Sequence, residues 1–287
     1  MAISTPADAG ESIMSDLVAI GRAADDPLFY FREWTSDVTH PWDCQHCWEM
    51  SNPALDDFLS RDAMRTVRKT SREHAFRRFR LGQWLEVAED AWITPEQLSS
   101  TKLDKPIPDG SEVVIGFDGS FSMDATGIVA VTVSRRPHID KVAVWEPKGE
   151  GYRIPVADVE DAIRTACRRW KVREVVCDPY RWTKSMQELA SERLPIREFP
   201  QSAQRMTPAT TGLYEAICNH EVTHSGDPDL MRHFLNARIT EDSRGTRIHK
   251  QDKNSNKKID LAVCSLMAHS RAISIATKKS SRRVYSW

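Results

Sequence analysis

Apolar residues recur at helical intervals between residues 55 and 85, which predicts short helices in this part of the chain. The recurring positions are Phe58, Met64, Val67, Phe76, Phe79 and Trp84. A stretch with two prolines and a glycine, LDKPIPDG at 103–110, then interrupts the pattern, as is typical of a boundary. We therefore predict a small, mainly helical N-terminal segment, residues 1–105, followed by a domain over residues 106–287.

Beyond this boundary the pattern is typical of a mixed α/β domain. Apolar, β-branched runs with short connections predict three antiparallel strands, at 112–118, 126–133 and 141–147. Helices are predicted at 156–170, 182–193, 207–219, 228–238 and 258–274, further strands at 173–179 and 195–200, and a basic strand or loop at 244–252. The order β-β-β-α-β-α-β-α-α-α favours a mixed sheet flanked by helices. This order resembles that of RNase H-like domains.

Charged residues nearly balance over the whole chain, with 40 Lys and Arg against 41 Asp and Glu. The balance counts against a uniformly basic nucleic-acid binder, although local fields rather than the total decide binding. Residues 61–80 carry a clear excess of arginine and lysine over acidic residues. That excess fits either a solvated helix face or a surface for phosphate backbones, and the sequence leaves both interpretations open.

Three aspartates stand where predicted elements begin or end. Asp118 ends the first strand, Asp178 ends the fourth, and Asp260 opens the last helix. Sites in α/β sheets form at the carboxyl ends of strands, and the first and fourth strands are neighbours in an RNase H-like sheet. We therefore expect the three carboxylates in one crevice. Each aspartate alone is equally typical of a turn or a helix cap, so the prediction depends on the order of the elements.

Three close carboxylates repel one another unless a cation lies among them, and hard oxygen ligands suit Mg²⁺ or Mn²⁺. Two such ions about 3.5–4 Å apart promote phosphodiester hydrolysis. The pattern thus predicts a metal-dependent nuclease centre. Asp124 is either an accessory ligand or a turn residue. Four lysines near the last helix are candidates for DNA contacts: Lys250, Lys253, Lys257 and Lys258. For the pair Lys257 and Lys258, a solvent-facing position is the alternative.

A second candidate metal motif lies in the N-terminal segment, where Cys44 and Cys47 form a C-x-x-C pair near His40 and His46. Structural zinc sites usually join two such pairs, and this sequence has no second one. A zinc site here would need all four residues in one tight loop. The alternative is free thiols in a reducing compartment, which the absence of a secretory signal favours. No run of 18 apolar residues is present, so we expect no membrane span.

Five segments resemble parts of the large subunit of tailed-phage terminases. Three resemble the acidic segments of its nuclease: GFDGSFSMDATGIVAVTV at 116–133, REVVCDPYRW at 173–182 and NSNKKIDLAVCSLMAHSRA at 254–272. Two resemble the region that joins the terminase ATPase to the nuclease: SNPAL at 51–55 and FRRFRLGQWLEVAEDAWI at 76–93. The resemblance implies that residues 1–105 are a helical linker or remnant of the ATPase region.

The resemblance also implies an activity and a setting. The nuclease would cut concatemeric double-stranded viral DNA during packaging in the host cytoplasm, with Asp118, Asp178 and Asp260 as metal ligands. Its partners would be the ATPase part, the small terminase subunit and the portal. The chain lacks the P-loop pattern G-x-x-x-x-G-K-[ST], so we expect it neither to hydrolyse ATP nor to translocate DNA. Two alternatives remain: another RNase H-like nuclease, of resolvase or transposase type, and a non-catalytic DNA-docking module.

Overall fold

The computed structural model describes residues 3–6, 13–24, 26–71, 73–85, 90–120, 124–147, 149, 151–180, 182–251 and 257–283. The chain divides into two compact units, residues 1–89 and residues 90–287. The two units are treated separately below, each with its own core.

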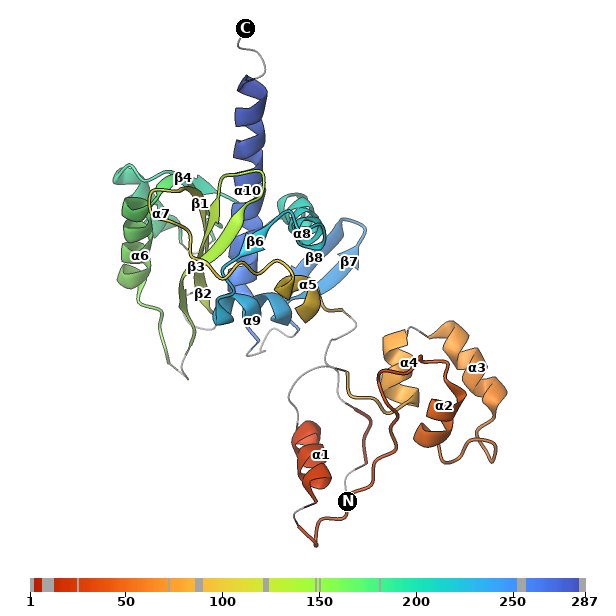
Figure 1. Cartoon of the computed structure of the whole chain (residues 1–287). Coiled ribbons are helices and arrows are strands. Elements are labelled where there is room, and N and C mark those ends of the chain that lie inside the picture. Colours follow the sequence, from red (N-terminus) through yellow and green to blue (C-terminus); the bar gives the residue numbers. More distant parts are fainter. Residues whose placement is uncertain are drawn as a thin grey trace. The chain divides into compact units, whose positions relative to one another are not determined.

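The N-terminal unit is helical, as the spacing of its apolar residues predicts (Figure 1). Its helices are α1 (Ile13–Ala23), α2 (Gln45–Ser51), α3 (Arg61–Thr70) and α4 (Glu73–Arg80). Its core is small and gathers around four fully buried side chains: Trp48, Met64, Phe76 and Leu81. Phe58 departs from the predicted helical stripe, because it lies in the turn before α3 and is 86% exposed.

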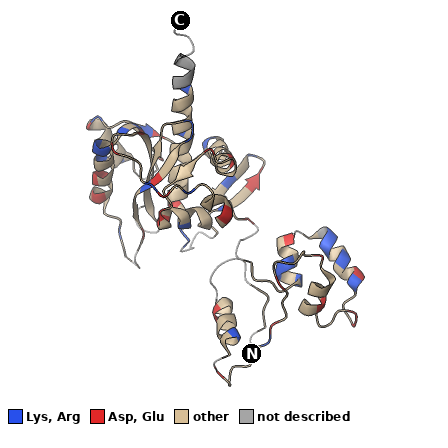
Figure 2. Ribbon diagram, in the orientation of Figure 1, with Lys and Arg blue, Asp and Glu red and all other residues tan. Residues whose placement is uncertain are grey.

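The basic excess of residues 61–80 lies on α3 and α4, where Figure 2 shows several blue bands. Several of these cations have acidic partners. Arg61 contacts both Asp56 and Glu49, and Arg65 contacts Asp62 one turn away. Further pairs join Arg68 to Asp43 and Arg77 to Glu73. Part of the excess is therefore neutralised within the unit, and a role toward phosphate backbones stays a prediction.

The C-terminal unit contains a six-stranded mixed sheet in the order β5-β4-β1-β2-β3-β6 (Figure 1). The strands are β1 (Glu112–Asp118), β2 (Thr126–Thr132), β3 (His138–Trp145), β4 (Lys171–Cys177), β5 (Ile196–Glu198) and β6 (Thr223–His224). β1, β2 and β3 form the predicted antiparallel meander, and β4 pairs with β1 in parallel. The predicted fold class, an RNase H-like mixed sheet flanked by helices, is confirmed.

Helices cover both faces of this sheet because the side chains of its strands alternate between two apolar cores. In β1, Val114 packs in the core shared with α8 (Ala203–Cys218), α9 (Pro228–Asn236) and α10 (Asp260–Arg283). Its neighbours Val113 and Ile115 pack in the core shared with α6 (Val156–Arg169) and α7 (Thr183–Ser191). Central strands buried on both faces explain the nearly continuous apolar runs in the sequence.

Two short strands were not predicted, and a third was predicted as a strand or loop. β6 has only two residues, too few for a periodic pattern. β7 (Arg238–Asp242) and β8 (Gly245–His249) form a separate antiparallel hairpin, and β8 corresponds to the segment predicted as a basic strand or loop. The predicted helix 228–238 ends at Asn236, so Arg238 belongs to the hairpin.

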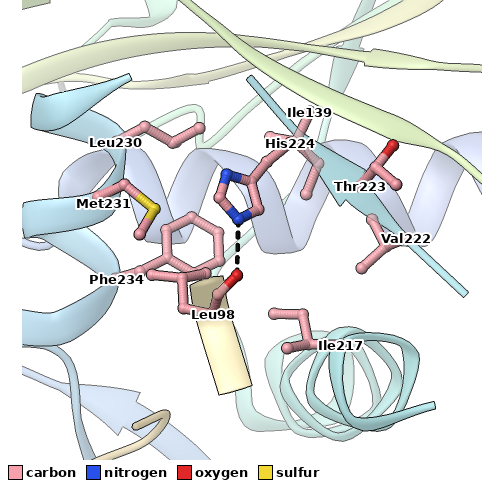
Figure 3. Close-up of a pocket in the computed structure, with 9 residues that line it drawn as sticks. All are labelled: Leu98, Ile139, Ile217, Val222, Thr223, His224, Leu230, Met231 and Phe234. Atoms are coloured by element: carbon pink, nitrogen blue, oxygen red, sulfur yellow. Dashed lines mark hydrogen bonds between the residues drawn. The ribbon is translucent and has the colours of Figure 1, made fainter. Parts of the chain in front are cut away.

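Residues 90–105 pack with the C-terminal unit, so the structural division lies before the predicted boundary at 105. α5 (Pro95–Ser99) begins with a capping box and lays Leu98 against α8, α9 and β6. Figure 3 shows this apolar pocket, in which the Nε2–H of His224 donates to the carbonyl of Leu98 at 2.8 Å. Burial lowers the pKa of His224, which favours the neutral ring that this contact needs. The pocket is therefore part of the packing between α5 and the edge of the sheet.

No helix in the described ranges is long and apolar enough to cross a membrane.

Candidate active site at the carboxyl edge of the sheet

Asp118 and Asp178 meet at one edge because their strands are parallel neighbours. Asp118 is the last residue of β1, and Asp178 directly follows β4. Gln201, after β5, lies between them. Its side-chain amide donates to Asp118 Oδ1 at 2.8 Å, and its backbone N–H donates to Asp178 Oδ2 at 3.3 Å. The expected proximity of these two carboxylates is therefore present.

The close approach of α10 to the sheet brings Asp260 to the same edge. Gly116 in β1 faces the carbonyl of Cys264 in α10, and a Cβ at Gly116 would lie only 2.2 Å from that oxygen. Cys264 is anchored further by its thiol, which donates to the carbonyl of Gly127 in β2 at 3.2 Å. Asp260, one turn before Cys264, thereby opens α10 beside Asp118.

The pKa values of Asp118 and Asp260 are raised because both carboxyl groups are shielded from solvent. Asp260 is only 5% exposed, and its Oδ2 atom has no hydrogen-bond partner in the described part of the chain. Burial and then the nearby Asp118 raise the pKa of Asp260 to about 7. Burial, with Asp178 adding to it, raises the pKa of Asp118 to about 6 despite the hydrogen bond from Gln201. A nearby cation would stabilise the charged forms of both carboxylates.

Two of the four candidate lysines point into this acidic edge. Lys250, at the end of the β7–β8 hairpin, forms an ion pair with Asp124, and its side chain is 16% exposed. Lys258 approaches the other oxygen of Asp124 at 3.5 Å and is 12% exposed. Both also interact with Asp260. The alternative of a solvent-facing side chain is thus wrong for Lys258, whereas Lys253 lies outside the described residues.

Asp124 has two structural contacts besides its lysine partners. Its side chain accepts from the backbone of Ala125 at 2.9 Å, and its own N–H donates to Ser120 Oγ at 3.3 Å. These contacts are typical of the turn residue that the sequence offered as an alternative. The charge of Asp124 positions Lys250 and Lys258 beside the acidic edge, a role that the sequence alone did not predict.

Gln201 and Gly116 are the residues that sequence reasoning missed. Gln201 follows the short β5, and no motif marks it. Gly116 was visible as a glycine inside an apolar strand, which is a known sign of close backbone approach.

The three aspartates do not form one tight cluster of ligand atoms. Among the described residues, the trio of metal-ligating side chains whose ligand atoms all lie within 4.8 Å is in the N-terminal unit instead. At the acidic edge, the Gln201 amide and the Lys250 ammonium group lie among the carboxylates. Carboxylate oxygens nevertheless remain the principal donors there, and they are the ligands that Mg²⁺ and Mn²⁺ prefer.

Comparison with known proteins shows which family this part of the chain resembles. Residues 135–275 match the model described as "Terminase large subunit, endonuclease domain". This range includes Asp178 and Asp260, and Asp118 precedes it. The chain is 29% identical over 209 residues to the Gene 13 protein of Mycobacterium phage L5, and 28% identical over 234 residues to that of Mycobacterium phage D29.

The matched region spans 35% of the length of the phage L5 protein and 39% of the phage D29 protein. It covers 64% and 72% of the present chain, respectively. Among solved structures, the large terminase of bacteriophage HK97 matches with a TM-score of 0.54 and 19% identity. That match covers 89% of this chain and 60% of the HK97 chain. At this level of identity the likeness concerns the fold.

Proposed function

We propose that this chain, which carries the endonuclease domain of a terminase large subunit, hydrolyses phosphodiester bonds of double-stranded DNA with divalent metal ions. The observation that supports this proposal is the convergence of Asp118, Asp178 and Asp260 at the carboxyl edge of the sheet. In this reading, these three side chains are the catalytic residues.

The donor set fits Mg²⁺ or Mn²⁺. Asp260 offers a buried carboxylate oxygen without a hydrogen-bond partner in the described chain, and Asp118 has a raised pKa beside it. A buried polar atom without a partner is costly, and a cation would satisfy it. Asp118, Asp178 and Asp260 would hold the metal, two ions in our proposal. When bound, the ions would supply an activated water and charge stabilisation for the leaving oxygen.

The remaining residues at the edge would position the DNA and the carboxylates. Lys250 and Lys258 carry positive charge beside the aspartates and would attract the phosphate backbone. Asp124 holds both ammonium groups in place. Gln201 fixes the carboxylate of Asp118 by donating a hydrogen bond, so that the oxygen available for a cation keeps a constant orientation. Lys253 and Lys257 stay candidate DNA contacts.

The biological setting is proposed from the relatives. The match to a terminase large subunit supports cleavage of concatemeric viral DNA during packaging, in the host cytoplasm. The partners would be an ATPase part, a small terminase subunit and a portal. Residues 1–89 form the helical unit that we propose as the linker or remnant of the ATPase region.

Plasmid cleavage by the purified chain tests the nuclease. We expect nicking and linearisation with Mn²⁺ or Mg²⁺, none with EDTA, and none by the Asp118→Asn and Asp260→Asn variants. Asp161→Asn is the matched control, since Asp161 is an exposed aspartate on α6 and its variant should cut at the wild-type rate. Cleavage by Asp118→Asn at the wild-type rate would remove Asp118 from the site. DNA binding without cleavage in any metal would favour a docking module instead.

A further inference from the structure

Four metal-ligating side chains gather at the start of α2 in the N-terminal unit. One candidate ligand atom from each of His40, His46 and Cys47 lies within 4.8 Å of the other two. Cys44 adds a fourth donor, with its Sγ atom 3.7 Å from His40 Nδ1. Cys44 is the N-cap of α2 and Cys47 lies in its first turn, and both thiols contact the ring of His40 in the preceding loop.

The distances agree with those expected around zinc. Zn–S bonds of about 2.3 Å and Zn–N bonds of about 2.0–2.1 Å at tetrahedral angles place sulfur and nitrogen ligands about 3.6 Å apart. His40 Nδ1 lies 3.4 Å from the Sγ atom of Cys47 and 3.7 Å from that of Cys44. One imidazole nitrogen thus lies as far from two thiol sulfurs as neighbouring ligands lie from each other in a tetrahedral zinc site.

We propose that His40, Cys44, His46 and Cys47 bind a structural zinc ion. The sequence argued against such a site because the motif lacks a second C-x-x-C pair. The geometry supplies what that argument lacked: the loop before α2 brings Nδ1 of His40 to 3.7 and 3.4 Å from the thiols of Cys44 and Cys47, and the first turn of α2 adds His46. A thiolate–imidazole set is typical of structural zinc, whereas the carboxylates at the sheet edge suit harder cations.

Two side chains from outside the motif hold the loop in this shape. The side-chain amide of Gln83, which is 1% exposed, donates to the carbonyls of Ser36 at 3.3 Å and Asp37 at 2.9 Å. The guanidinium of Arg77 on α4 donates to the carbonyl of His40 at 3.1 Å. The backbone that carries His40 is therefore fixed by the folded unit, which reduces the cost of ordering a ligand for the metal.

The small size of the N-terminal unit suggests what a bound ion would do, which is to stabilise the folded unit. Among the described residues of this unit, the buried apolar side chains form one small cluster, and small units commonly depend on a metal or disulfide. Cys47 is followed directly by Trp48, the largest side chain of that cluster, whose indole N–H donates to the carbonyl of Trp42. A zinc ion would tie the loop 40–44 to the helix that carries Trp48 into the core.

Metal analysis of the full chain, purified without chelator or metal affinity steps, tests the proposal. We expect about one zinc per chain by mass spectrometry, as in a four-ligand structural site. Replacement by Co²⁺ should give the strong visible absorption of tetrahedral cobalt and a thiolate charge-transfer band in the near ultraviolet. Metal held by carboxylates alone gives no such band, so the spectrum separates this site from the sheet edge.

Two variants locate the site, and one serves as control. Cys44→Ser and His40→Ala should lose the thiolate–cobalt spectrum or weaken zinc binding at least tenfold. Both change residues with some solvent exposure, so the fold should survive. Cys218→Ser is the control, because Cys218 is an exposed thiol on α8 and should leave the zinc content unchanged. Wild-type chain without stoichiometric zinc and without the cobalt spectrum would overturn the proposal, as would a Cys44–Cys47 disulfide in protein kept under reducing conditions.

Discussion

Gly116→Ala is the substitution that most directly tests how the fold builds the acidic edge. Gly116 lies in the middle of β1, where the backbone of α10 crosses the sheet. A methyl group there would meet the carbonyl oxygen of Cys264 at 2.2 Å and its carbon at 2.9 Å. Ordinary contacts begin near 3.4 Å, so α10 must move outward by about 1 Å to admit the methyl group.

The expected cost follows from this displacement. Overpacking a well-filled core by one methyl group destabilises a protein by about 1–3 kcal/mol. Asp260 belongs to the same helix, one turn from Cys264, and would move with it relative to Asp118. A misplacement of about 1 Å lowers catalytic rates by roughly a hundredfold. A domain with a typical stability of about 5–15 kcal/mol would still be folded, so we expect the loss of cleavage to exceed any loss of folded protein.

The stability part is measured by urea denaturation followed by circular dichroism, and the catalytic part by the plasmid cleavage rate. Gly212→Ala is the matched control. A Cβ at Gly212 meets nothing within 4 Å, and the position lies inside α8. Alanine there should stabilise the chain by up to about 1 kcal/mol through helix propensity. Equal stability of the Gly116→Ala variant and the wild-type chain would show that the contact between β1 and α10 is looser than this geometry requires.

Three further predictions concern the stability of the C-terminal unit. Thr94→Ala removes the capping box that Thr94 forms with Gln97, and urea denaturation should show a loss of about 1 kcal/mol. Arg271→Met removes a two-point contact of 2.7 and 2.8 Å with Glu174, and we expect a loss of about 1.5–3 kcal/mol that shrinks when Glu174→Gln is added. Burial lowers the pKa of His269 from 6.5 to about 4, so the folded chain binds a proton less readily than the unfolded chain. Stability is therefore unaffected by this group above pH 6.5 and falls as the pH decreases toward 4, by about 2 kcal/mol at pH 5. The variant His269→Leu should lose this component in melts at pH 7.5 and pH 5, and an unchanged pH dependence would show that His269 is not the group responsible.

The sequence predicted the parts of the fold that have strong periodicity. The helix at Val156–Arg169 and the strand at Glu112–Asp118 differ from their predicted bounds by one residue at most. The same patterns placed Asp118, Asp178 and Asp260 at element ends, where the structure has them. Such positions are predictable because a buried strand has to change composition where it leaves the core.

Contacts between distant segments were not predictable in this way. Gln201 reaches Asp118 across 83 positions of sequence, and Lys250 reaches Asp124 across 126. No local pattern distinguishes a glutamine or lysine that will turn inward from one that stays in solvent. Likewise, the division at residue 89 depends on Leu98 entering the core of the C-terminal unit, although the prolines at 106 and 108 mark a later break.

The two candidate metal sites follow from the different cores of the two units. In the C-terminal unit, apolar clusters cover both faces of the sheet, and they can hold Asp260 buried even though burial raises its pKa. Such a site holds carboxylates where burial disfavours their charged forms, and perturbed pKa values of this kind are common at catalytic centres. In the N-terminal unit the core is too small for such an arrangement. Its ligands instead come from one loop and one helix start, and Cys47 leads straight into the buried Trp48. Removing metal should therefore have opposite signatures: loss of cleavage with little change in stability at the sheet edge, and loss of stability in the N-terminal unit.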